Sequence, residues 1–98
     1  MANYIGLFQW TEQGVKDYAG SADRAAQARQ AIEKMGGKLV HTYWTLGPYD
    51  FVAILEFPDD ETATAFALRI SALGNVRSTT MRAFDEAEFK AIVAKAKA

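Results

Sequence analysis

Cysteine is absent from the sequence, so disulfide bonds, cysteine-based zinc sites and thiol nucleophiles are excluded. An excess of charge of one sign is also absent, because 11 Lys and Arg residues face 12 Asp and Glu residues. This balance gives no electrostatic reason to expect nucleic acid or an anionic membrane as a partner. No apolar run approaches the roughly 18 residues of a membrane span, and the N-terminus lacks the pattern of a signal peptide. We therefore expect a cytoplasmic protein.

Hydrophobic residues make up 50% of the 98 residues, which is the composition of an ordinary globular protein. A chain of this length is typical of one domain, and we expect residues 1–98 to form it. Four runs rich in aromatic and β-branched residues predict strands, and three stretches between or after them show helical spacing of apolar residues. The expected strands are 4–10, 38–46, 51–57 and 76–84, and the expected helices are about 21–35, 59–73 and 86–97.

Each expected helix has recognisable end signals. Ser21 stands where an N-cap would begin the first helix, and its stripe of small alanines predicts a close approach to a sheet. Pro58 with an acidic first turn begins the second helix. Asp85 and Glu88 have the spacing of a capping box at the start of the third.

This order of elements predicts an α+β fold of the ferredoxin-like type, β-α-β-β-α-β, with an extra C-terminal helix. Right-handed crossovers give an antiparallel sheet of order 4-1-3-2. The first two helices can cover only one face of the sheet. The other face must meet something else.

The turn between the second and third strands decides which residues lie on that open face. A loop of two or four residues pairs His41 with Glu56 and Tyr43 with Ile54 on the open face, and the first strand adds Ile5, Leu7 and Gln9 to it. Such a face is too apolar for a monomer. We therefore expect a second copy to cover it as a homodimer or a higher homo-oligomer, with two sheets enclosing a barrel-like interior.

The chain resembles the GYD domain family of small bacterial proteins over nearly its whole length. The residues that carry the resemblance are Trp10–Gly14, Gly36-Gly37, Leu46–Phe51 with Gly47, Tyr49 and Asp50 as the name motif, Pro58–Glu61, and Leu73–Arg77. The family is similar to the wider group of dimeric α+β barrels, which includes cofactor-free monooxygenases, haem-degrading enzymes and ligand-sensing modules. The resemblance implies a fold and an internal cavity but no single reaction.

Candidate chemistry centres on His41, the only histidine, which excludes a multi-histidine metal site within one chain. With Glu56 as its partner, and with Tyr43 nearby, it would be the general base of a cofactor-free enzyme. It could also be an axial haem ligand, although we expect no cofactor. The alternative is an ordinary ion pair at a dimer interface.

Four further residues are candidate ligand-binding groups: Gln9, Tyr49, Asp50 and Arg82. Tyr49 and Asp50 would stand at the rim of a cavity, and Arg82 on the last strand could bind an anion. Three of them also have a structural interpretation. Asp50 can accept backbone N–H groups at the turn, Tyr49 can pack over the loop, and an arginine on an edge strand is often solvated.

Three functions remain open from the sequence. The first is a homo-oligomer that binds a small molecule between its sheet and a partner sheet. The second is a cofactor-free monooxygenase or isomerase that uses His41, Glu56 and Tyr43. The third is a structural or regulatory assembly module with a filled interior.

Overall fold

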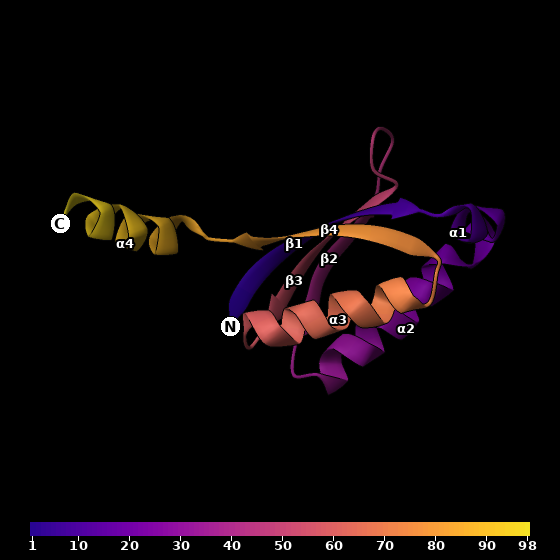
Figure 1. Ribbon diagram of the computed structural model, residues 1–98, viewed down its shortest axis with the longest axis horizontal. Coiled ribbons are helices and arrows are strands. Elements are labelled where there is room, and N and C mark those ends of the chain that lie inside the picture. The colour runs from indigo at the N-terminus through magenta and orange to yellow at the C-terminus, as the bar shows by residue number, and fades with distance from the viewer.

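The computed structural model describes residues 1–98 and has one sheet, two helices on one face of it, and a C-terminal helix that projects to the side (Figure 1). The expected order of elements is confirmed. The segment 15–20, which the sequence leaves open as a loop or a helical turn, contains the end of a short helix and a 3₁₀ turn. The elements are β1 (Ala2–Trp10), α1 (Glu12–Lys16), η1 (Tyr18–Gly20), α2 (Ser21–Lys34), β2 (Lys38–Trp44), β3 (Phe51–Phe57), α3 (Asp60–Ala72), β4 (Val76–Ala83) and α4 (Glu86–Lys97).

The sheet is antiparallel with the order β2-β3-β1-β4, which is the predicted order read from the other edge. β1 and β3 are the central strands, and both carry apolar residues on their two faces, which is typical of strands inside a sheet. α2 and α3 lie together on one face of the sheet (Figure 1). Burial alternates along β1, where Tyr4, Gly6 and Phe8 face the helices and are buried. The core is completed from β3 by Leu55 and Phe57, and from the helices by Ile32, Ala63 and Phe66.

The predicted register of the β2–β3 hairpin was wrong by two residues. Thr42 lies opposite Ala53 and Trp44 opposite Phe51, because the connecting turn contains six residues, 45–50, rather than two or four. An even number of loop residues still keeps the side chains of 41–44 and 51–57 on their expected faces. An irregularity between Leu39 and His41 then changes the alternation in β2. Continued alternation would place Val40 on the face covered by the helices, but Leu39 is the residue that is buried there.

Two of the three predicted helix starts are capped by an aspartate side chain. Asp59 accepts the backbone N–H of Thr62 at 2.8 Å, and hydrogen bonds from that residue hold the pKa of Asp59 below its usual value. Asp85 and Glu88 form the reciprocal capping box. Ser21 is not an N-cap: it is the first residue of α2, and its buried hydroxyl accepts the indole N–H of Trp44 at 3.0 Å.

Helix α4 stands apart from the rest of the molecule and gives it a length of 52 Å against a thickness of 19 Å (Figure 1). Phe89, Ile92 and Val93 follow helical spacing, and their side chains are 58%, 38% and 39% exposed. A helix of this length is marginally stable in water without tertiary contacts. The apolar side of α4 is therefore an unpartnered surface.

Tyr4 joins the sheet to the start of α3, since its hydroxyl donates to Asp60 Oδ1 at 2.6 Å. Burial, reinforced by the Asp60 carboxylate, raises the pKa of Tyr4 to about 12.

A raised pKa means that the folded state holds the phenol proton more tightly than the unfolded state. We therefore expect a contribution to stability that is complete below pH 10 and is lost as the pH rises toward 12. The free energy of unfolding, measured with urea from pH 10 to 12, should fall more steeply with pH for the wild type than for Tyr4→Phe. Equal slopes would contradict the assignment.

Candidate functional site

The open face of the sheet carries an apolar centre with polar groups around it. Ile5 lies opposite Ile54, and Leu7 lies opposite Val52, so these four side chains from the two central strands are neighbours. Met81 on β4 and Tyr43 on β2 extend the apolar area and are 42% and 57% exposed. Polar residues surround this centre on the same face: Asn3, Gln9, Lys38, His41, Glu56, Arg77 and Thr79.

The predicted pairing of His41 with Glu56 is wrong. His41 lies opposite Ile54, and Glu56 lies opposite Lys38, as a result of the longer turn and the irregularity in β2. The ring of His41 stands beside that of Tyr43, with centroids 5.8 Å apart and planes inclined by 30°. The structure therefore places His41, Tyr43 and Glu56 on the same face, as expected, but brings only the first two together. No carboxylate orients the imidazole as a general base would require.

Asp50 connects the hairpin turn to the end of β1. Its backbone N–H donates to the carbonyl of Phe8 at 2.8 Å, and its carboxylate Oδ2 accepts the backbone N–H of Trp10 at 2.8 Å. Gln9 donates from Nε2 to the carbonyl of Pro48 at 3.0 Å, so two of the candidate ligand-binding residues hold the same turn from one strand. Asp50 therefore has the structural role that the sequence suggested, since its carboxylate accepts a backbone N–H group.

Tyr49 is half-buried, and its carbonyl accepts the hydroxyl of Thr45 at 2.6 Å. The tip of the loop projects from the sheet (Figure 1), with Leu46 fully exposed and no heavy atom near a Cβ built on Gly47. Gln9, Asp50 and Arg77 line a shallow polar recess at the base of this loop.

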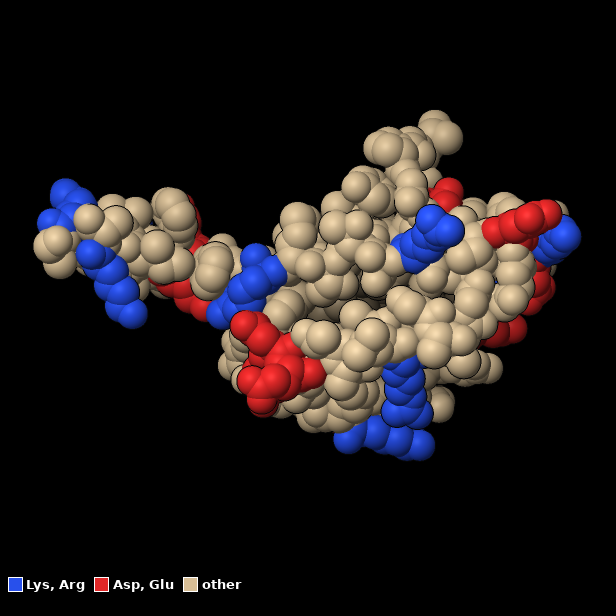
Figure 2. All heavy atoms as spheres, viewed as in Figure 1, with Lys and Arg blue, Asp and Glu red and all other residues tan.

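Arg82, the fourth candidate ligand-binding residue, is surrounded by partners within the chain. Its guanidinium lies 3.5 Å from Glu88 Oε2 and 3.9 Å from Asp60 Oδ1, and donates to the carbonyl of Asn3 at 3.2 Å. It also stands over the Phe84 ring, 4.5 Å from the centroid. These contacts tie the stem of α4 to the sheet, next to the acidic side chains that gather where α3 begins (Figure 2). Arg82 therefore links β1, α3 and α4 through its side-chain contacts.

Two segments that carry the family resemblance meet at one end of the sheet. Thr11 donates its backbone N–H to the carbonyl of Asn75 at 3.1 Å, and Gln13 donates to the carbonyl of Leu73 at 3.1 Å. A Cβ on Gly14 would lie 1.9 Å from the carbonyl oxygen of Asn75, so only glycine fits this approach. These residues hold the connection between α3 and β4 against α1, which is a structural role.

A cavity between the sheet and its own helices was not predicted. A space of about 440 Å³ lies there and is lined mainly by apolar side chains, including Phe8, Ile32, Phe51 and Phe66. Figure 2 shows the surface hollowed between the sheet and α3. The available signal in the sequence was the row of alanines on α2. Small side chains on a helix predict that it approaches the sheet closely, but here they leave an open space between α2 and the strands.

No group of three or more His, Asp or Glu side chains in the chain is arranged to hold a metal ion. Whether His41 binds haem stays a prediction. None of the helices combines the length and the apolar character that crossing a membrane requires.

The fold and the open face together define a ferredoxin-like α+β domain of the kind whose sheet is left uncovered on one side. The chain belongs to the GYD domain family, whose model matches residues 4–93.

A similar protein from Thermus thermophilus is described as a glutamine synthetase and cystathionine beta-lyase binding protein. It is 30% identical over 89 residues, which cover 90% of this chain and 94% of that protein.

Two solved structures share the fold. TTHA0845 from Thermus thermophilus has a TM-score of 0.56 and 24% identity, over 87% of this chain and 95% of its own. MtbAldR (Rv2779c) has a TM-score of 0.61 and 15% identity, over 87% of this chain and 52% of its own.

Proposed function

We propose that this chain is a homodimeric binding module that docks on an enzyme of amino-acid metabolism. The observation that carries the proposal is the open sheet face, where Ile5, Leu7, Val52 and Ile54 form an apolar centre within a polar rim. An apolar core surrounded by polar residues is the usual anatomy of a protein interface. Two copies related by a two-fold axis would cover this face on each other.

The identity of the enzyme partner is proposed from the Thermus thermophilus relative, whose description includes binding to glutamine synthetase and cystathionine β-lyase. Helix α4 supplies a suitable docking element. Phe89, Ile92 and Val93 have the i, i+3, i+4 spacing of an amphipathic helix that lies in a partner groove. The contacts of Arg82 with Glu88 and Phe84 hold the stem of this helix away from the body, where a partner can reach it.

The test is binding of the purified chain to glutamine synthetase and to cystathionine β-lyase from its own host, measured by biolayer interferometry. We expect at least one enzyme to bind the wild type, and Ile92→Asp to weaken that binding about tenfold or more, since a charge would enter an apolar contact. Val15→Asp is the matched control, because Val15 is 47% exposed and lies on α1.

Three outcomes contradict parts of this proposal. Absence of binding to either enzyme removes the partner class. Equal binding by the wild type and Ile92→Asp removes α4 as the contact. Loss of the dimer in Ile92→Asp, seen by sedimentation, assigns α4 to the contact between copies instead.

A second candidate is a small-molecule binder whose ligand lies between the paired sheets. It is favoured by His41, Tyr43 and Gln9, which place hydrogen-bonding groups beside the apolar centre. Native mass spectrometry of protein purified from its own host would report the assembly and a retained ligand together. A dimer with the bare mass of two chains would count against this candidate.

A further inference from the structure

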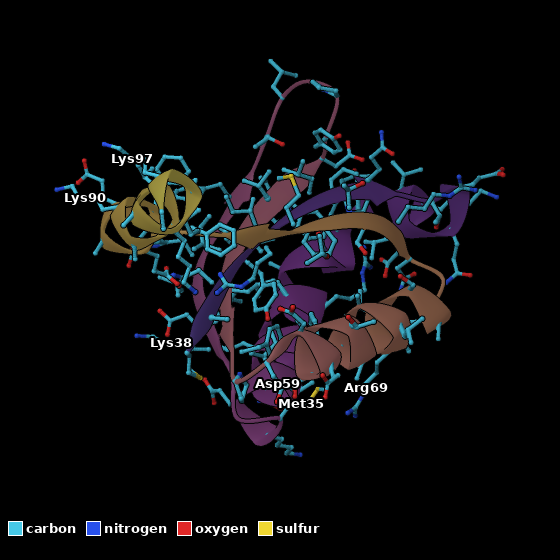
Figure 3. All side chains as sticks on the ribbon, turned by 60° about the vertical axis from the view of Figure 1, so that its left-hand side comes forward. Met35, Lys38, Asp59, Arg69, Lys90 and Lys97 are labelled. Atoms are coloured by element: carbon cyan, nitrogen blue, oxygen red, sulfur yellow. The ribbon has the colours of Figure 1, made fainter.

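The polar recess at the base of the β2–β3 loop is formed by three separate segments of the chain. Its lining consists of Gln9, Trp10, Thr11, Glu12, Pro48, Asp50 and Arg77. Every one of these residues except Gln9 belongs to a segment that carries the family resemblance. The loop extends beyond the sheet on the side away from α2 and α3 (Figures 1 and 3), and the recess shares only Trp10 with the lining of the apolar cavity. The three segments therefore meet at a polar surface that the proposed docking does not use.

Hydrogen bonds within the chain hold the walls of this recess in place. Asp50 accepts the backbone N–H of Trp10 on its oxygen Oδ2 at 2.8 Å, and Gln9 donates from Nε2 to the carbonyl of Pro48 at 3.0 Å. Each of these side chains has a second oxygen, Oδ1 of Asp50 and Oε1 of Gln9, that accepts no hydrogen bond from the chain. Two acceptor oxygens are thus held by the fold and are free to accept from a ligand.

The charged groups of the recess do not pair with one another. Arg77 is exposed and has no carboxylate within 4.0 Å, although Glu12 and Asp50 line the same recess. Glu12 lies 3.6 Å from Nζ of Lys16, and an ion pair as exposed as this one contributes little. Figure 2 shows basic and acidic side chains next to each other below the loop. A molecule that carries both charges could meet both sides of the recess at once.

We propose that this recess binds a small zwitterion, a free α-amino acid with a polar side chain. Its carboxylate lies against the guanidinium of Arg77, which is suited to carboxylates. Its ammonium group, a donor only, lies among Glu12 and the free oxygens of Asp50 and Gln9. The two carboxylates disfavour a simple anion, and the guanidinium disfavours a simple cation. One chain supplies the whole lining, so binding there requires neither the dimer nor the enzyme partner proposed above.

The test follows the backbone amide signals of Trp10, Thr11 and Arg77 in the ¹⁵N-labelled full chain by nuclear magnetic resonance. The probes are L-glutamine, which carries both charges, L-glutaminamide, which lacks the carboxylate, and N-acetyl-L-glutamine, which lacks the ammonium group. We expect L-glutamine to move these signals saturably, with a dissociation constant on the order of 1 mM, as befits so small a ligand. Each of the other two probes should bind about tenfold more weakly, because one charge-assisted contact is lost.

A pair of arginine variants tests the contact with the carboxylate. Arg77→Gln should weaken L-glutamine binding about tenfold and leave L-glutaminamide binding unchanged, because that probe has no carboxylate. Arg69→Gln is the matched control and should bind like the wild type. Arg69 is also exposed and also has no carboxylate within 4.0 Å, but it extends from α3 on the side away from the sheet (Figure 3).

A further variant tests the contact with the ammonium group. Glu12→Gln should weaken L-glutamine binding several-fold, whereas N-acetyl-L-glutamine should bind no more weakly than it does to the wild type. The side chain of Glu12 is 86% exposed, so the substitution should leave the fold intact.

Three results would overturn the proposal. The first is that the signals do not move with L-glutamine up to tens of millimolar, the range in which so small a ligand must bind if it binds at all. The second is equal binding of L-glutamine and either single-charge probe, which would show that only one charge is recognised. The third is equal L-glutamine binding by the wild type and Arg77→Gln. Each of these results leaves the proposed dimer and enzyme docking untouched, since those are measured separately.

Discussion

Replacing Ile54 by lysine should convert the protein from a dimer to a monomer at micromolar concentration. Ile54 lies on the central strand β3, opposite both Ile5 and His41, and so occupies the middle of the open face. In a sheet-to-sheet dimer, a lysine there would lose its hydration without gaining a carboxylate partner. Such a loss costs at least about 3 kcal/mol, which corresponds to about a hundredfold in the dissociation constant. Sedimentation velocity over a range of protein concentrations measures the dissociation constant of the dimer for the wild type and the variant.

The matched control is Leu68→Lys, because Leu68 lies on α3 and is 68% exposed on the opposite side of the sheet. It should leave the dimer intact. Circular dichroism of both variants checks that each is folded. A wild-type monomer at micromolar concentration would remove the dimer proposal altogether. A dimeric Ile54→Lys would place the contact between copies elsewhere, with the apolar side of α4 as the remaining candidate.

Replacing Asp50 by alanine should lower the free energy of unfolding by about 1.5–3 kcal/mol, the usual effect of losing a hydrogen bond to a charged group. The carboxylate of Asp50 accepts the backbone N–H of Trp10 at 2.8 Å, just where β1 ends and the hairpin turn crosses it. Without the carboxylate, that partly buried N–H has no acceptor in the turn. Urea unfolding of the wild type and the variant gives the difference.

Two further substitutions separate the hydrogen bond from other effects. Asp50→Asn keeps an oxygen acceptor without the charge and should lower the free energy of unfolding by about half as much as Asp50→Ala does. Tyr49→Phe should change stability by less than about 0.5 kcal/mol, because no hydrogen bond of the Tyr49 hydroxyl is formed within the chain. A negligible effect of Asp50→Ala would contradict the structural role. It would return Asp50 to the candidate ligand-binding residues.

The fold was predictable because its signals are local. Caps such as Asp59 and the Asp85–Glu88 box act within one helical turn, and the apolar residues of β1 and β3 mark them as central strands. Once the order of elements was known, the handedness of the crossovers determined the order of the strands. Ser21 shows the limit of this reasoning, since its hydroxyl is used by Trp44 from another element rather than by its own helix.

The candidate site was less predictable because it depends on distances between elements. The sequence by itself predicted which face His41, Tyr43 and Glu56 occupy on the condition that the loop has an even number of residues, since an even loop length preserves the alternation of side chains. Only the tertiary structure decided that His41 lies opposite Ile54 rather than Glu56, because the turn has six residues and β2 is irregular. The same holds for the cavity beneath the sheet and for the direction of α4. Both features arise between elements that are far apart in the sequence: the cavity is lined by residues of the sheet, α2 and α3, and the stem of α4 contacts the sheet through Arg82, Glu88 and Asn3.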